Sequence, residues 1–333
     1  MEVFKTIAGF NEWMLIWPEI TLGLLAIFLI VVDLFLPEKY KNFIPLCAFV
    51  GQLVICVALC LRGEGRPNFN FNQLIYQSVW IKVIRVFFLT SSLLVTYLGC
   101  IYFKKHALIR SEFYAILMIA TGALMLLVQA NHFVMVFVAL ETFAIAGFVL
   151  TSYDRMSAFS LEAGLKFLIF GALSSAILLF GIVLLYGVAG NPMLENSTAD
   201  ALNFTQLGKF IEVNAHNPLV QVGAVLVLVG LFFKMGVVPF QVWIPDVYQG
   251  APTPVTALLA VSSKAAGFIV VLNLVHHGDF SWVSGDSYGP FFHLNYLLVP
   301  LLSGLTVITI LYGNIAALSQ SNVKKLMGYS GIA

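Results

Sequence analysis

Nine stretches of roughly 20 mostly apolar residues recur along this chain of 333 residues, and they constrain its fold more than any other feature. They are residues 14–36, 43–61, 82–103, 113–130, 132–152, 163–188, 219–242, 253–275 and 295–317. About 20 apolar residues in a helix cross the hydrocarbon core of a bilayer. A tenth stretch begins near Lys324 and reaches Ala333, which suggests a fragment of a longer chain. The pattern therefore predicts an all-α polytopic membrane protein with nine to ten transmembrane helices.

Composition excludes most soluble classes. The chain is 60% hydrophobic and 10% charged, whereas soluble domains are about 45–50% apolar and about 25% charged. The net charge of +1 offers no basic surface for a nucleic acid. The first apolar run is too long for the core of a cleaved signal peptide and follows acidic Glu2 and Glu12, so it is expected to be a transmembrane helix.

The connections between the runs differ in charge. Three long polar connections, at 62–81, 189–218 and 276–294, share one side of the membrane if the helices alternate. The opposite side has eight basic residues in short loops, namely Lys39, Lys41, Lys104, Lys105, Arg110, Arg155, Lys324 and Lys325. The first side has Lys5, Arg62, Arg66 and Lys209, or six basic residues if Lys82 and Arg85 are counted. The positive-inside rule then predicts an outside N-terminus.

Cofactor motifs are missing from the sequence. The four cysteines, Cys47, Cys56, Cys60 and Cys100, lie in apolar runs and form no Cys-x-x-Cys pair. No G-x-G-x-x-G opens a helix after a strand. We therefore expect no iron–sulfur cluster, metal, nicotinamide or flavin in this chain.

Ionisable residues inside the apolar runs are the candidate functional groups, because a charge at the bilayer centre costs at least about 2.5 kcal/mol. Glu141 lies midway along its run, and its partner must come from another helix. Lys234 and Lys264 lie deep in successive runs, and a buried lysine that can lose its charge near neutral pH suits a proton carrier. A structural ion pair between Glu141 and Lys234, or a protonated Glu141, are the alternatives.

Three other charges have simpler explanations. Lys166 follows Glu162 by one turn, so an i, i+4 pair explains it as well as a relay role does. Glu19 and Asp33 lie near the ends of the first run, where structural roles are favoured.

The run that carries Lys234 also contains helix breakers. Gly236, Pro239 and Pro245 follow the lysine, and Pro252 and Pro254 come after them. Proline removes a backbone donor, and broken backbone at membrane depth occurs where it is buried in protein or lines a watery cavity. A broken helix is therefore predicted near 236–252, with Asp246 capping a helix or anchoring the loop.

The segment 230–268 reads GLFFKMGVVPFQVWIPDVYQGAPTPVTALLAVSSKAAGF. It resembles the antiporter-like proton-channel subunits of complex I, which share a lysine, a Trp-x-Pro-Asp, a Pro-Thr-Pro turn and a second lysine. The sequence of residues 248–257 is similar to that of subunit N, which is called subunit 2 in mitochondria and chloroplasts. Residues 166–187 and 322–330 are similar to it as well.

The resemblance implies a fold and a set of roles. The family fold has fourteen helices with two inverted five-helix repeats. On this chain it implies three N-terminal helices in 1–112, a first repeat in 113–275 and the incomplete start of a second in 295–333. Glu141 matches the modulating glutamate, Lys234 the lysine of the broken helix and Lys264 the relay lysine. The family's ionisable group on the twelfth helix is missing here.

The expected function is therefore proton translocation within an NADH:quinone oxidoreductase, in a bacterial inner membrane. Other membrane subunits would be its partners, and NADH, FMN, iron–sulfur clusters and quinone would be used by the complex outside this chain. Two alternatives stay open: a subunit of an Mrp-type sodium/proton antiporter, and a structural membrane subunit without proton traffic.

Overall fold

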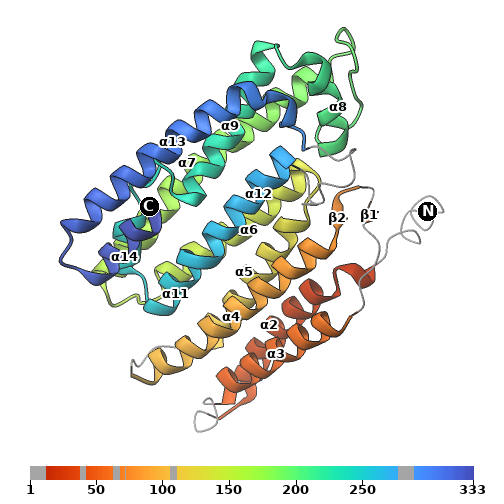
Figure 1. Cartoon of the computed structure of the whole chain (residues 1–333). Coiled ribbons are helices and arrows are strands. Elements are labelled where there is room, and N and C mark those ends of the chain that lie inside the picture. The colour runs from red at the N-terminus through yellow and green to blue at the C-terminus, as the bar shows by residue number, and fades with distance from the viewer. Residues whose placement is uncertain (1–12, 38–42, 63–67, 72, 106–110, 277–288) are drawn as a thin grey trace. The chain divides into compact units, whose positions relative to one another are not determined.

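The computed structural model describes residues 13–37, 43–62, 68–71, 73–105, 111–276 and 289–333 (Figure 1). Within these residues, nine helices are long and apolar enough to cross a membrane, and each overlaps one of the nine predicted runs. The chain divides into two compact units, Met1–Ala146 and Gly147–Ala333, and the division falls inside one helix. The fold is thus helical and polytopic, as the apolar runs predict.

The first unit is built around a buried helix. Its elements are η1 (Trp13–Leu15), α2 (Trp17–Phe35), α3 (Ile44–Leu61), β1 (Asn68–Asn70), β2 (Ile75–Gln77), α4 (Val79–Lys105), α5 (Ser111–Gln129) and α6 (Phe133–Thr151), the last of which ends in the second unit. Helix α5 packs against both α2 and α4, and most of its side chains are buried. β1 and β2 form a short antiparallel hairpin in which Asn68 faces Gln77.

The second unit contains the helix interruptions. Its elements are α7 (Ala158–Ala189), α8 (Phe204–Asn214), α9 (Pro218–Met235), α10 (Ile244–Gly250), α11 (Thr253–Leu258), the π-helical turn η3 (Leu259–Ser263), α12 (Lys264–His276), η4 (Phe292–Leu294), α13 (Asn295–Leu318) and α14 (Val323–Ile332). Helices α7 and α9 run side by side (Figure 1). A Cβ at Gly181 would lie 2.7 Å from the backbone nitrogen of Val227, so only glycine permits this close approach.

Helix α9 ends where the sequence predicts a break. Gly236 adopts φ 77°, a left-handed conformation that favours glycine, and its N–H donates to the carbonyls of Phe232 and Phe233. The indole Nε1–H of Trp243 donates to the Phe233 carbonyl at 3.1 Å. The N–H of Val238 donates to Thr309 Oγ1 at 3.1 Å. These bonds pair backbone groups that the break removes from the helix ladder.

Several predicted boundaries change. The run 219–242 is helical only to Met235, because Gly236 terminates the helix. The connection 62–81 contains the β1–β2 hairpin, and 189–218 contains α8, an amphipathic helix that Asn203 caps. Residues 277–288 of the third predicted connection lie outside the described residues, as do Lys5, Lys39, Lys41, Arg66 and Arg110 of the charge count. The repeat boundaries at 112/113 and 275/295 stay a prediction.

Candidate functional site

Lys234 is buried at the end of α9. Its residue exposure is 4%, and it lies in the last helical turn, directly before the break. The carbonyl groups at a helix C-terminus carry partial negative charge and stabilise a cation there. The fold therefore supplies a local electrostatic reason for an ammonium group in this apolar segment.

Lys264 is buried directly after the π-helical turn of the next span. It has 8% exposure, and the helix register changes immediately before it. Its Nζ donates to the Gly331 carbonyl in α14 and lies 5.8 Å from the centre of the Tyr248 ring in α10. A cation within about 6 Å of an aromatic face is attracted to it. Single π turns inside α-helices are frequent at functional sites.

The two lysines flank one helix contact. Helix α12 packs against α9, and a Cβ at Gly267 would lie 2.7 Å from Cγ of Met235. Met235 follows Lys234 by one residue, and Gly267 follows Lys264 by three, about one helical turn. The contact therefore joins the helix end that carries one lysine to the turn that follows the other.

Lys166 belongs to an ion-pair cluster near the start of α7. Its Nζ lies 2.7 Å from Oε1 of Glu162 and 2.6 Å from Oδ2 of Asp246, while Lys325 Nζ lies 3.3 Å from the other Asp246 oxygen. The Lys166 hydrogen bond is the main reason why the pKa of Asp246 is below its usual value. The predicted i, i+4 pair is present, and Asp246 anchors α10 to α7 and α14.

Helix α14 is also tied to the end of α10 by a lysine. Lys324 Nζ donates to the Ala251 carbonyl at 2.8 Å, and burial lowers the pKa of this lysine. Asn322 caps the start of α14 by accepting from two backbone N–H groups. Together with the bond from Lys264, these contacts fix α14 against the broken segment.

Glu141 lies midway along α6 and is partly exposed. It belongs to the first unit, whereas Lys234 and Lys264 belong to the second. The pairing of Glu141 with Lys234 therefore stays a prediction.

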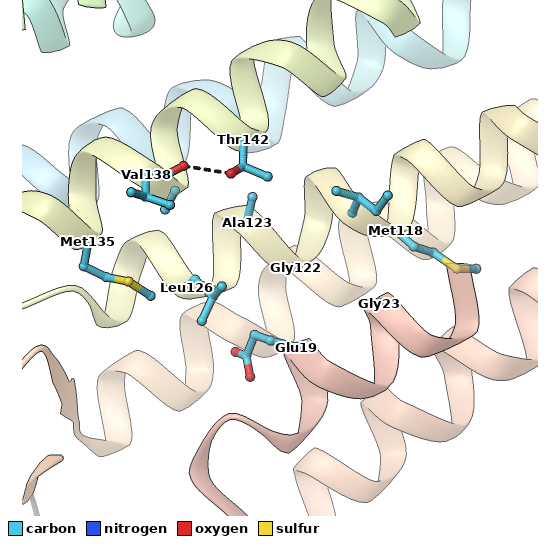
Figure 2. Close-up of a pocket in the computed structure, with 11 residues that line it drawn as sticks. Glu19, Gly23, Met118, Gly122, Ala123, Leu126, Met135, Val138 and Thr142 are labelled. Carbon is cyan, nitrogen blue, oxygen red and sulfur yellow. Dashed lines mark hydrogen bonds between the residues drawn. The ribbon is translucent and has the colours of Figure 1, made fainter. Parts of the chain in front are cut away.

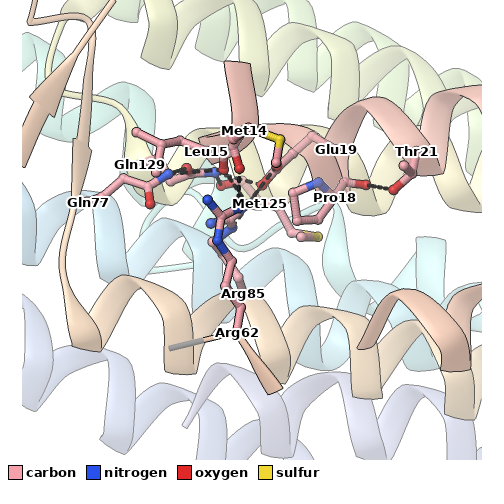
Figure 3. A network of polar contacts seen from close by, with 10 residues as sticks. All are labelled: Met14, Leu15, Pro18, Glu19, Thr21, Arg62, Gln77, Arg85, Met125 and Gln129. Atoms are coloured by element: carbon pink, nitrogen blue, oxygen red, sulfur yellow. Dashed lines mark hydrogen bonds and ion pairs between the residues drawn. The ribbon is translucent and has the colours of Figure 1, made fainter. Parts of the chain in front are cut away.

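Glu19 is paired by a residue that the sequence reasoning placed among possible loop charges. Arg85 donates from Nε to Glu19 Oε1 at 2.9 Å and from Nη2 to Oε2 at 2.7 Å (Figure 3). Both side chains are 4% exposed. Gln129 donates to the same carboxylate at 2.7 Å and accepts from Gln77 at 2.9 Å. This network joins α2, α4, α5 and β2, so the structural role favoured for Glu19 agrees with the geometry.

Arg85 was missed as an intramembrane residue, although its position inside the run 82–103 is the signal that could have placed it there. Asp33, the other charge of the first run, accepts from the hydroxyl of Ser111 at 2.7 Å, which lies at the start of α5.

A cavity of about 200 Å³ lies beside Glu19 in the first unit (Figure 2). Its walls come from α2, α5 and α6 and are apolar apart from Glu19 and Thr142, whose hydroxyl donates to the Val138 carbonyl. Small residues, including Gly23 and Gly122, create the space.

Among the described residues, no group of three or more His, Cys, Asp or Glu side chains could hold a metal ion. The donor sets that bind iron–sulfur clusters need four cysteine or histidine ligands. The described part of the chain thus does not fit such a cluster.

Comparison with known proteins places this geometry in a family. The family model described as "NADH:quinone oxidoreductase/Mrp antiporter, TM" matches residues 130–333. NADH-quinone oxidoreductase subunit N 1 of Opitutus terrae is 52% identical over the whole chain, which covers 64% of that relative. NAD(P)H-quinone oxidoreductase subunit 2 of Gloeothece citriformis is 34% identical, with 95% of this chain and 58% of that relative covered.

Solved structures agree on the fold. A chain of respiratory complex I from Thermus thermophilus matches with a TM-score of 0.70 and 27% identity, covering 95% of this chain and 62% of that one. A chain of an archaeal membrane-bound sulfane sulfur reductase matches with a TM-score of 0.71 and 24% identity, which shows the fold alone. The chain thus spans slightly less than two thirds of the length of these relatives. Because the family model matches more than half of the chain, the chain belongs to the NADH:quinone oxidoreductase/Mrp antiporter transmembrane family.

Proposed function

We propose that this chain translocates protons as a membrane subunit of an NADH:quinone oxidoreductase. The observation that carries the proposal is the burial of Lys234 and Lys264 at two irregular points of the membrane-spanning backbone, on helices that pack against each other. A deeply buried lysine without a function is costly to maintain. The similarity to oxidoreductase subunits at 52% and 34% identity supports this function over the Mrp-type antiporter.

The chemistry is proton transfer without a covalent intermediate. The Lys234 ammonium releases a proton to ordered water, and the Lys264 amine takes up a proton, so one positive charge leaves α9 and one appears on α12. Glu141 biases this step by electrostatics, since a nearby carboxylate favours the charged form of a lysine. Lys166 has a positioning role through Asp246, because its ammonium is held in two ion pairs.

The setting follows from the same resemblance. Neighbouring membrane subunits are the partners, and the complex uses NADH, FMN, iron–sulfur clusters and quinone in other chains. The membrane is the bacterial inner membrane with the N-terminus outside. Residues 113–275 form the first repeat, and 295–333 begin the second.

The test is NADH-driven acidification of inverted vesicles that contain the full complex, with NADH oxidation followed in parallel. Lys234→Ala is expected to abolish acidification in an assembled complex. Lys209→Ala is the control, because Lys209 is exposed on α8. Normal pumping by Lys234→Ala would favour a structural subunit, and a wild type without any NADH-driven signal would favour the antiporter.

A further inference from the structure

Tyr248 is a buried residue of the broken segment to which neither the sequence motifs nor the proposed function assigns a role. It lies in α10 with 1% exposure. Its hydroxyl finds no hydrogen-bond partner within the described part of the chain. Buried hydroxyl groups in proteins nearly always have a partner, and where no protein atom provides it, an ordered water does.

The surroundings of Tyr248 are polar on the side of Lys264. The ammonium nitrogen lies 5.8 Å from the ring centre and donates one hydrogen bond to the Gly331 carbonyl. An ammonium group has three donors, so two remain for other acceptors. Two hydrogen bonds of about 2.8 Å in series span roughly 5–6 Å, which is the scale of the distance between this nitrogen and the ring centre.

A second buried acceptor lies in the same segment. Oε1 of Gln241, a residue with 6% exposure in the turn between α9 and α10, also has no hydrogen-bond partner among the described residues. Two buried polar atoms within eight residues of each other thus lack a protein partner, and ordered buried water in proteins typically bonds to such groups. The two hydrogen bonds at the break that involve the Trp243 and Thr309 side chains have both donor and acceptor in the protein.

We propose that Tyr248 positions the proton transfer at Lys264: its ring holds the ammonium beside the Gly331 carbonyl, and its hydroxyl holds the water through which Lys264 exchanges its proton. This inference rests on the proposed function. The water accepts the proton that leaves the ammonium and passes one onward, so its own charge is restored. Burial raises the pKa of the Tyr248 hydroxyl, so the tyrosine stays neutral and acts as a fixed hydrogen-bonding group.

Two substitutions in the full complex separate the ring from the hydroxyl. Tyr248→Phe keeps the ring and removes the hydroxyl, whereas Tyr248→Leu removes both. Tyr186→Phe is the control, because Tyr186 is 53% exposed on α7. The readouts are the rate of NADH-driven acidification, its ratio in H₂O and D₂O, and water density near Tyr248 in a high-resolution structure of the complex.

The inference predicts that Tyr248→Phe slows acidification by at least about tenfold and raises the solvent isotope ratio, because the proton step becomes rate-limiting. Tyr248→Leu should be slower still. A purely structural role would leave the isotope ratio unchanged. If the complex with Tyr248→Phe fails to assemble, the density near Tyr248 in the wild-type complex provides the test. Water bonded to the hydroxyl there supports the inference.

Three results overturn the inference. They are a Tyr248→Phe complex that matches Tyr186→Phe in rate and isotope ratio, a defect in Tyr248→Leu alone, and a hydroxyl bonded only to protein in the density. Each of these leaves the proposed function intact provided that Lys234→Ala still abolishes pumping. Normal pumping by Lys234→Ala refutes the proposed function whatever Tyr248 does.

Discussion

Replacing Arg85 by methionine would break the buried ion pair of the first unit and leave the Glu19 carboxylate with Gln129 as its remaining side-chain donor. The two paired side chains are only 4% exposed, so the carboxylate has little contact with bulk water. The folded variant would then bury a carboxylate that has lost its cation. Removing one partner of a buried pair typically costs about 3–5 kcal/mol.

A cost of this size raises the ratio of unfolded to folded protein by roughly a hundredfold to several thousandfold. Most of this cost comes from the carboxylate that stays buried without its cation, because a single charge in the protein interior is solvated poorly.

The thiol of Cys56 offers an assay for this unit. Cys56 is buried in α3, so its reaction with a thiol-specific fluorophore reports opening of the first unit. We suggest following this reaction against temperature and denaturant in the purified full-length subunit, with Cys56 as its one cysteine. Lys82→Met is the matched control, because Lys82 lies one turn earlier on α4 and its bond to the Arg62 carbonyl is exposed.

The double variant Glu19→Leu, Arg85→Met should recover most of the lost stability, because it removes the uncompensated charge together with its partner. An Arg85→Met variant that unfolds like Lys82→Met would refute the reasoning. A double variant that is no more stable than Arg85→Met would show that the cost does not come from the unpaired charge.

Three further outcomes follow from the second unit. Trp243→Phe keeps an aromatic ring but loses the indole hydrogen bond, so the free energy of unfolding in denaturant titrations should fall by about 1 kcal/mol; an unchanged value would mean that the bond contributes nothing. The pKa of Asp246 is lowered by Lys166, so its carboxylate stabilises the fold above its ordinary value of 3.8 and this stabilisation is lost as the pH falls below it. Thermal melts from pH 6 to pH 3 should therefore decline more steeply for the wild type than for Asp246→Asn, and parallel curves would contradict this. Gly250→Ala should lower the melting temperature, because its Cβ would lie 2.3 Å from a backbone oxygen of α7, while Gly187→Ala has open space and should be neutral or slightly stabilising.

The number and approximate positions of the membrane-spanning helices could be predicted from the sequence, because the bilayer determines their length and composition. Hydrocarbon demands about 20 apolar residues per helix, and the nine helices found in the described residues follow this demand. The break after Lys234 could also be predicted, because Gly236 and Pro239 act locally. The hairpin between α3 and α4 could not, since its strands are three residues long and their pairing depends on contacts across the turn.

Some features of the candidate site could likewise be predicted from the sequence, and others could not. Burial of Lys234 and Lys264 follows from their depth in apolar runs. The hydrogen-bond partners of buried charges do not follow from the sequence, because they come from distant parts of the chain. Gly331 is 67 residues from Lys264, and Arg85 is 66 residues from Glu19. Sequence spacing predicts neighbours within one helix, such as Glu162 and Lys166, and gives no register between helices.

The arrangement of the breaks argues against a purely structural subunit. A scaffold has no need to interrupt its helices, since an unbroken helix pairs its backbone groups without help. In this chain α9 stops at Gly236, and side chains of Trp243 and Thr309 are required to pair the groups set free. The neighbouring span changes register in a π-helical turn immediately before Lys264. Both irregularities coincide with a buried lysine, so the features that weaken the helices lie at the two groups on which the proposed proton transfer depends.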